Sequence, residues 1–350
     1  MASAILPRMS DHLVPLVEIA AAREVIAGRV HRTPTLSSAA AAAEIRAAGG
    51  PAIADGRLHL KAEHFQKTCS FKPRGALHKL DSLSAAERAP GVITVSAGNA
   101  AQGFAWAGRE LGVHVVVVMP LGAVHSKVDA CRAYGAEVVL FGEHVGETFD
   151  EMQRLREERG LTLCHSFDDP ALIAGYGSIG LEILEDLPDA DVVVVPIGGG
   201  GLISGVATAI KESKPGVRIF GVEPERSNAL SIAVERGEIV RIVPVSVADG
   251  LGAPFAGEWT LAAAQRYLEG IVLLDDSTIL GGLRFAALHL KQVLEPAGAA
   301  ALAAVLYGRV PLRAGERVCV VLSGGNVDLD RFGAFLEAAA PLPSASPVPA

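Results

Sequence analysis

One lysine stands where it could act as a nucleophile. Lys72 lies in the segment Ser-Phe-Lys-Pro-Arg-Gly, which resembles the start of a helix. Pro73 suits a first helical turn, and Ser70 could cap it. The positive end of a helix lowers the pKa of a nearby amine, and a lysine that is often neutral can condense with an aldehyde. Taken alone, such a lysine is more often a solvated surface residue, because most lysines are exposed.

A second segment with chemical potential is Ser-Ala-Gly-Asn-Ala-Ala-Gln-Gly, which closes an apolar run and opens a helical one. Free backbone N–H groups at such a helix start can bind a carboxylate. The residues expected to contact a substrate in this way are Ser96, Ala97, Gly98, Asn99 and Ala100. Asn99 could present its amide to a ring oxygen, or it could simply cap the helix.

Four consecutive glycines, residues 198–201, follow a third apolar run. Several backbone N–H groups can then converge on a phosphate at a helix N-terminus. A turn without ligand is one alternative. Another is a nicotinamide dinucleotide site, because Gly199, Gly201 and Ser204 approximate G-x-G-x-x-G and Glu223 ends the next strand. That match lacks its third glycine.

The fourth segment is Val-Leu-Ser-Gly-Gly-Asn, residues 321–326, at the end of another apolar run. The hydroxyl of Ser323 could hydrogen bond to a pyridine nitrogen without needing a charge. The same residues are also ordinary turn formers.

Short runs rich in valine and isoleucine alternate with segments of helical length, which is typical of buried parallel strands and their connecting helices. An α/β fold is therefore predicted. The predicted strands are residues 91–96, 113–119, 137–141, 191–196, 218–222 and 317–322. The predicted helices are residues 99–111, 124–134, 171–186, 200–212, 277–290, 297–306 and 329–339. The proline-rich residues 340–350 are expected to be disordered.

Composition narrows the function classes. The formal net charge is −8 and the basic residues are scattered, so nucleic acid is not an expected partner. Four widely spaced cysteines indicate reduced thiols in a cytoplasm instead of a zinc site or disulfide framework. No signal peptide is evident over residues 1–11. Residues 192–210 are uncharged, but Pro196 and the four glycines would break a membrane-spanning helix.

Together, the four segments resemble those of the threonine and serine dehydratase group of pyridoxal 5′-phosphate (PLP) enzymes, which also contains serine racemase. The resemblance runs from about residue 32 to residue 338 and implies a tryptophan synthase β-like fold. Two domains are then expected, each an open, mostly parallel twisted sheet flanked by helices, with PLP in the cleft between them. The large domain would comprise residues 11–68 and 166–339, and the small one residues 69–165.

The resemblance also implies roles for individual residues. Lys72 would bear the cofactor, Asn99 would contact its 3-hydroxyl, residues 198–201 would bind its phosphate, and Ser323 would face its pyridine nitrogen. Lys72 and Ser323 are the expected catalytic residues. The remaining residues expected at the cofactor are Phe71, Leu202 and Gly324. Two further segments, residues 248–250 and 294–299, are expected to line the cleft.

Several positions depart from the pattern of the family. Cys69 replaces a usual glycine and is expected to pack beneath the cofactor as a small apolar residue. Ala97 stands where serine racemases carry serine, and a methyl group cannot transfer a proton. Glu223 is a weak candidate metal ligand, but Ala229 replaces the second carboxylate, so no metal is predicted and a solvated or loop-capping Glu223 is expected.

The predicted function is PLP-dependent elimination and deamination of L-threonine or L-serine, giving a 2-oxo acid and ammonia. The freed Lys72 amine would remove the α-proton. Alternatives are a serine racemase and a 3-hydroxyaspartate dehydratase, in which His64 or Arg74 would receive the second carboxylate. An NAD-binding or amino-acid-binding protein without PLP would leave Lys72 unexplained. A homodimer is expected from base rates.

Overall fold

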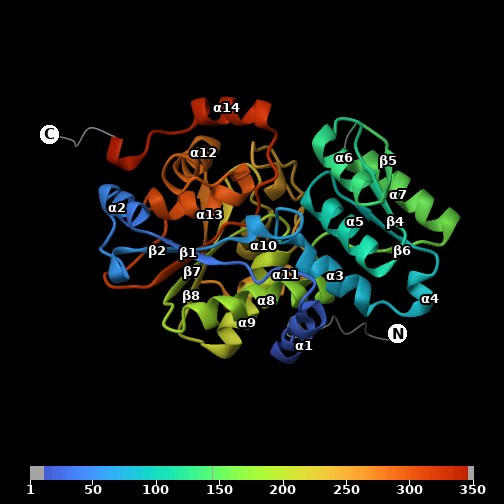
Figure 1. Cartoon of the computed structure of the whole chain (residues 1–350), viewed down its shortest axis with the longest axis horizontal. Coiled ribbons are helices and arrows are strands. Elements are labelled where there is room, and N and C mark those ends of the chain that lie inside the picture. Colours follow the sequence, from blue (N-terminus) through green and yellow to red (C-terminus); the bar gives the residue numbers. More distant parts are fainter. Residues whose placement is uncertain (1–11, 144, 346–350) are drawn as a thin grey trace.

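Runs of β-branched residues form two separate sheets, each covered by helices on both faces (Figure 1). The structure is a computed structural model that describes residues 12–143 and 145–345. The expectation for residues 1–11 therefore lies outside the described residues. Two mostly parallel sheets flanked by helices confirm the predicted fold class, whereas the predicted domain boundaries stay a prediction.

The larger sheet has six strands in the order β1-β2-β10-β7-β8-β9. All neighbours are parallel except β1 and β2. The strands are β1 (Thr35–Ser38), β2 (Leu58–Lys61), β7 (Val192–Pro196), β8 (Arg218–Pro224), β9 (Gly270–Leu274) and β10 (Val318–Val321). Successive residues of β7 face opposite ways: Val193 packs with α8 and α9, and Val194 packs with α13.

The smaller sheet has four parallel strands in the order β5-β4-β3-β6. They are β3 (Val92–Val95), β4 (Val115–Met119), β5 (Glu137–Leu140) and β6 (Thr162–Leu163). In β4, Val117 packs with Phe104 of α5, whereas Val118 packs with Met152 of α7. Burial on both faces explains why these strands are continuous apolar runs in the sequence.

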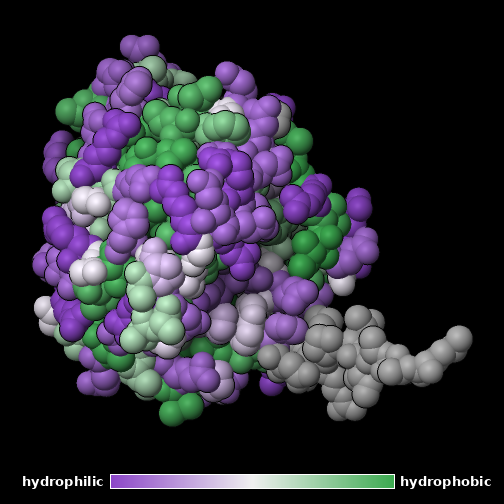
Figure 2. All heavy atoms as spheres, turned by 90° about the vertical axis from the view of Figure 1, so that its right-hand side faces the viewer, coloured by the Kyte–Doolittle hydropathy of each residue, from purple (hydrophilic) through white to green (hydrophobic). Residues whose placement is uncertain are grey.

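The helices that cover the two sheets are α1 (Leu16–Ile26), α2 (Ala39–Ala47), α3 (Lys72–Ser82), α4 (Ala85–Arg88), α5 (Asn99–Leu111), α6 (His125–Ala133), α7 (Val145–Arg159), α8 (Pro170–Asp186), α9 (Gly201–Ser213), α10 (Ala229–Arg236), α11 (Glu258–Tyr267), α12 (Asp276–Phe285), α13 (Pro296–Leu306) and α14 (Leu329–Ala338). No helix in residues 12–143 or 145–345 is long and apolar enough to cross a membrane. Over the smaller sheet, hydrophilic side chains dominate the surface and hydrophobic ones form separate patches (Figure 2).

Two predicted elements need correction. The helix predicted over residues 277–290 is α-helical only to Phe285, after which residues 286–290 form a π-turn that ends at Lys291 with φ 57°. The tail is ordered up to residue 345, where a 3-10 turn places the hydroxyl and backbone N–H of Ser344 against the Glu44 carboxylate. Disorder was therefore the wrong prediction for residues 340–345, and residues 346–350 lie outside the described part.

Candidate active site

A cavity of about 370 Å³ opens where the carboxyl ends of strands from both sheets meet. Its walls include nearly all of the residues that the sequence analysis selected. Those that line it are Phe71, Lys72, Ser96, Ala97, Gly98, Asn99, Ala100, Gly198, Gly199, Gly200, Gly201, Leu202 and Ser323. Segments as far apart in the sequence as Phe71 and Ser323 are thus brought to one place.

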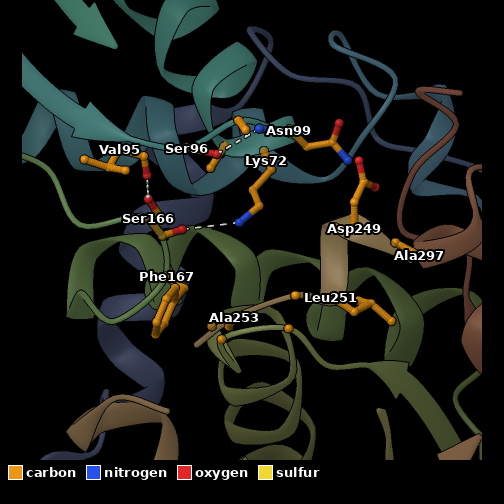
Figure 3. Close-up of a pocket in the computed structure, with 18 of the residues that line it drawn as sticks. Lys72, Val95, Ser96, Asn99, Ser166, Phe167, Asp249, Leu251, Ala253 and Ala297 are labelled. Carbon is orange, nitrogen blue, oxygen red and sulfur yellow. Dashed lines mark hydrogen bonds between the residues drawn. The ribbon is translucent and has the colours of Figure 1, made fainter. Parts of the chain in front are cut away.

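Lys72 is the first residue of α3, and its side chain points across the cavity (Figure 3). Its Nζ donates one long hydrogen bond, 3.3 Å, to the carbonyl oxygen of Ser166. Burial of this amine lowers its pKa to about 8, and the nearby Glu295 carboxylate only partly opposes that shift. Lys72 therefore combines a nearly unpaired amine with a neutral fraction of about a tenth at pH 7.

The predicted helix cap at Ser70 is wrong. The N-cap residue of α3 is Phe71, which already has helical backbone angles and makes no side-chain cap. Ser70 therefore lies one residue too early, and its Oγ is 3.4 Å from the Thr68 hydroxyl. Pro73 does occupy the first helical turn, as predicted.

A buried ion network holds the helix that carries Lys72. The Arg74 side chain is inaccessible to solvent and contacts Glu63 at 2.8 Å and Glu182 at 2.7 Å. Lys61 also contacts Glu182, at 2.7 Å. These pairs join α3 to β2 and α8, and removing one partner of such a buried pair is strongly destabilising. Because Arg74 is fully engaged and does not line the cavity, it is excluded as the receiver of a second substrate carboxylate.

The glycine loop between β7 and α9 leaves its backbone open. Gly200 has φ 92°, a left-handed conformation that disfavours other residues, and no side chain caps α9. A Cβ on Gly199 would lie 2.2 Å from the Phe167 ring. The loop thus lines the cavity with a helix start that has no side-chain cap, which is the kind of position that binds phosphate.

Asn99 is not a helix cap, because Gly98 takes the N-cap position of α5. Its side-chain Nδ2 donates to Glu295 Oε1, and its Oδ1 accepts from Asn326 Nδ2 at 2.8 Å. Nearby, the Ser96 Oγ accepts the Gly98 N–H at 3.2 Å and stabilises the turn before the helix (Figure 3). The amide of Asn99 is therefore held at the cavity wall in one orientation.

Ser323 and Gly324 are neighbours in the sequence, but only Ser323 lines the cavity. Ser323 lines the cavity, and its hydroxyl makes only a long 3.5 Å contact with the Ala297 carbonyl, so it can still pair with a ring nitrogen. Gly324 does not line the cavity, and its contact with a cofactor stays a prediction. A Cβ on Gly324 would lie 2.2 Å from Glu295 Oε1, so this glycine makes room for the glutamate.

The side chain of Cys69 is exposed, and its backbone has φ 54°. The expectation that Cys69 packs beneath the cofactor is therefore wrong. A positive φ favours glycine, which gives a physical reason for the glycine that the family usually carries here. All four cysteines of the chain are free thiols.

Sequence reasoning missed part of the cavity wall. His165, Ser166 and Phe167 follow β6, a strand of only two residues that gives almost no sequence signal. The Nδ1 of His165 accepts the Asp168 N–H at 2.8 Å, and burial lowers the pKa of this imidazole, so His165 is neutral. Further residues that line the cavity are Thr148, Phe149 and Met152 of α7, residues 249–255, and Glu295. The sequence resemblance had indicated only the segments with Asp249 and Glu295.

Glu223 lies outside the cavity lining and is fully buried. Its carboxylate accepts the backbone N–H groups of Leu230 at 3.0 Å and Ser231 at 2.8 Å, at the start of α10. Glu223 is therefore a helix-capping residue and not a solvated one. Because its carboxylate is occupied by these N–H groups, it is not available to bind the ribose of a nicotinamide dinucleotide. The described residues contain no group of three or more His, Cys, Asp or Glu side chains that could hold a metal.

The arrangement fits PLP. Lys72 offers a desolvated amine for its aldehyde, the loop around Gly199 offers free N–H groups for its phosphate, and Ser323 offers a hydroxyl for its ring nitrogen. Two mostly parallel sheets with this site between them define a PLP-dependent enzyme of the α/β class. Residues 26–324 match the family described as pyridoxal-phosphate dependent enzyme, and the chain belongs to this family.

Similar proteins share most of this chain. An L-threonine ammonia-lyase of Thermotoga maritima is 39% identical over 319 residues, which cover 91% of this chain and 77% of that protein. A catabolic L-threonine dehydratase of Escherichia coli K12 is 39% identical over 92% of this chain and 95% of its own length. The solved structure of maize serine racemase superimposes with a TM-score of 0.85 at 32% identity, covering 93% and 97% of the two chains.

Proposed function

We propose that this protein eliminates the β-hydroxyl of L-threonine or L-serine and releases a 2-oxo acid and ammonia. The observation that carries the proposal is the Lys72 amine, which is half-buried, nearly unpaired and lines the same cavity as the glycine loop. The names of the Thermotoga and E. coli relatives support the same reaction.

Each proposed step is assigned to residues of this chain. Bound PLP supplies the electron sink for the α-carbon. Lys72 would hold the cofactor, and its free amine would accept the α-proton of the substrate. The N–H groups at the start of α5, beside Asn99, bind the substrate carboxylate. Ser323 presents a neutral hydroxyl to the ring nitrogen, which favours prompt loss of the β-hydroxyl over transamination.

The charges at the cavity favour a substrate with a neutral side chain. Among the described residues that line it, Lys72 is the only lysine or arginine, and the imidazole of His165 is neutral. Asp249 and Glu295 are carboxylic side chains. A second substrate carboxylate would be left without a cationic partner and would lose its hydration, which is costly. This argues against 3-hydroxyaspartate.

Serine racemisation is the second candidate, favoured by the similarity to maize serine racemase. It needs an acid-base group on the face opposite Lys72. Ala97 lines the cavity where that group would stand and carries only a methyl. The reaction proposed for this chain is therefore elimination.

Release of ammonia from a panel of amino acids tests the proposal. The purified holoenzyme should act on L-threonine and L-serine and should turn over L-threo-3-hydroxyaspartate at least about a hundredfold less efficiently, since an unpaired buried charge costs several kcal/mol. Faster turnover of 3-hydroxyaspartate would contradict the assignment of the substrate class.

We also propose that the protein is a cytoplasmic homodimer. Large apolar side chains remain exposed at Phe65, Leu288 and Val293, with exposed fractions of 46%, 48% and 50%. A second copy would cover such residues, and two-fold dimers are the commonest assemblies. Light scattering after size exclusion should give twice the chain mass, and a monomer would contradict this part of the proposal.

A further inference from the structure

A buried carboxylic side chain stands directly behind the residue expected to contact the cofactor ring oxygen. Glu295 is 2% exposed, yet it reaches the cavity that contains Lys72. Its Oε1 accepts the Asn99 Nδ2 hydrogen. Its Oε2 is buried and has no hydrogen-bond partner among the described residues. A carboxylate is costly to bury, so this position calls for a functional explanation.

The contacts of Asn99 permit only one amide orientation. Asn326 donates its Nδ2 to Asn99 Oδ1 at 2.8 Å and to the Thr68 carbonyl at 2.8 Å. Turning the Asn99 amide over would place its oxygen against Glu295 and its nitrogen against the Asn326 nitrogen, and both contacts would be repulsive. The Asn99 Nδ2 therefore donates one of its two hydrogens to Glu295 and can donate the other to a ligand in the cavity.

A lysine on α6, a helix that covers the smaller sheet, faces the carboxylic group of Glu295. Lys127, on α6 and 5% exposed, contacts Asp249 at 2.6 Å. Lys127, Asp249 and Glu295 share a second cavity of about 20 Å³, which is large enough for one water molecule. Burial raises the pKa of Glu295 to about 7; Lys127 and Lys72 lower it, and Asp249 raises it further. The charge of Glu295 thus depends on Lys127.

We infer that Glu295 is a positioning residue that holds Asn99 as a hydrogen-bond donor toward the ring oxygen of bound PLP, and that Lys127 keeps Glu295 ionised. This inference rests on the proposed placement of the cofactor in the cavity. It concerns cofactor binding, so it is independent of which amino acid is the substrate.

A double-mutant cycle on the PLP dissociation constant tests whether Glu295 acts through Asn99. The proteins are the wild type, Asn99→Ala, Glu295→Ala and the double variant, each freed of cofactor and titrated with PLP. Each single change should weaken binding at least about tenfold, because a charge-assisted hydrogen bond is lost. The double variant should be no weaker than the weaker single variant. Multiplied effects of the two changes would overturn the inference.

A second arm uses pH and keeps the test valid if Glu295→Ala misfolds. Glu295→Gln keeps the size of the side chain but cannot ionise. The ratio of its PLP dissociation constant to that of the wild type should rise as the pH passes about 7, where Glu295 ionises. In a Lys127→Met background this rise should move to higher pH, because the stabilising cation is gone. The control Lys291→Met, which changes an exposed lysine, should not alter the pH at which the ratio rises. A ratio that is flat from pH 6 to 9 would overturn the inference.

Discussion

The chemistry of this site depends on one amine whose protonation is set by burial. At pH values below about 8 most Lys72 side chains are protonated and cannot attack an aldehyde. We therefore predict that the rate at which cofactor-free protein attaches PLP rises about tenfold per pH unit up to about pH 7.5 and then levels off near pH 8 to 9. Stopped-flow absorbance in the visible range measures this rate.

The matched control is Lys72→Ala, which should show no visible band and no PLP retained after borohydride reduction and mass spectrometry. PLP trapped on that variant would show that another lysine carries the cofactor. A rate that stays constant from pH 6.5 to 9 in the wild type would contradict the role of burial.

Cys69 provides a test of backbone conformation at the residue scale. Its φ of 54° is strained for any residue with a Cβ, at a cost of about 1–2 kcal/mol, and glycine removes that strain while making the unfolded chain more flexible. Cys69→Gly should therefore raise the free energy of unfolding of the holoenzyme by about 1 kcal/mol or less. Thermal unfolding followed by circular dichroism should show a higher midpoint for Cys69→Gly, whereas Cys69→Ala keeps the Cβ and should not. A gain with alanine equal to that with glycine would assign the effect to the thiol.

At the scale of elements, the turn between β7 and α9 combines a phosphate site with a packing contact. Gly199→Val should weaken PLP binding by at least about tenfold, because the side chain blocks the backbone and collides with the Phe167 ring. Equilibrium dialysis measures the dissociation constant. A Cβ added at Gly333, on α14, would meet no atom within 4 Å, so Gly333→Val provides the control.

Adding Phe167→Ala to Gly199→Val separates the two causes. Relief of the collision should restore stability, while the β-branched side chain still hinders the phosphate. If the double variant binds PLP as tightly as Phe167→Ala alone, the phosphate does not lie on this loop.

The elements that position the site could be predicted from sequence where the local signal is strong. The bounds of α5 were predicted as observed, and Lys72 begins α3 as expected. Apolar runs that end in Gly, Ser or Asn mark the carboxyl ends of strands, which is where parallel sheets bind ligands. The loop at Gly199 and the hydroxyl of Ser323 were found in this way.

Features set by distant contacts could not be predicted. The helix α7, rich in charged residues, is absent from the helices predicted from the sequence, although Phe149 on it lines the cavity. The sequence indicated the segment that contains Glu295 but not the contact of Glu295 with Asn99, because Asn99 is 196 residues away. Burial of Arg74 with Glu63 and Glu182 likewise exists only after α3, α8 and the 3-10 turn that follows β2 have packed together.

At the scale of the whole molecule, neither sheet alone completes the site. Asn99 and Ala97 come from the segment that follows β3 of the smaller sheet, whereas Gly199 and Ser323 follow strands of the larger one. The ion pair between Lys127 and Asp249 connects the two parts beside the cavity. The proposed sites for the substrate carboxylate and the cofactor phosphate thus come from different parts of the molecule, and the side chain of Lys72 points into the cavity that they line (Figure 3).

The central claim, elimination without a proton donor opposite Lys72, is tested most directly by following both products of one incubation. Holoenzyme with L-threonine is assayed for 2-oxobutyrate, while chiral chromatography measures the epimer inverted at the α-carbon. We predict that 2-oxobutyrate and ammonia form far faster than the epimer, and that Ala97→Ser raises the share of inversion. Rapid inversion by the unmodified protein with little 2-oxobutyrate would contradict it, because another residue would then have to supply the proton.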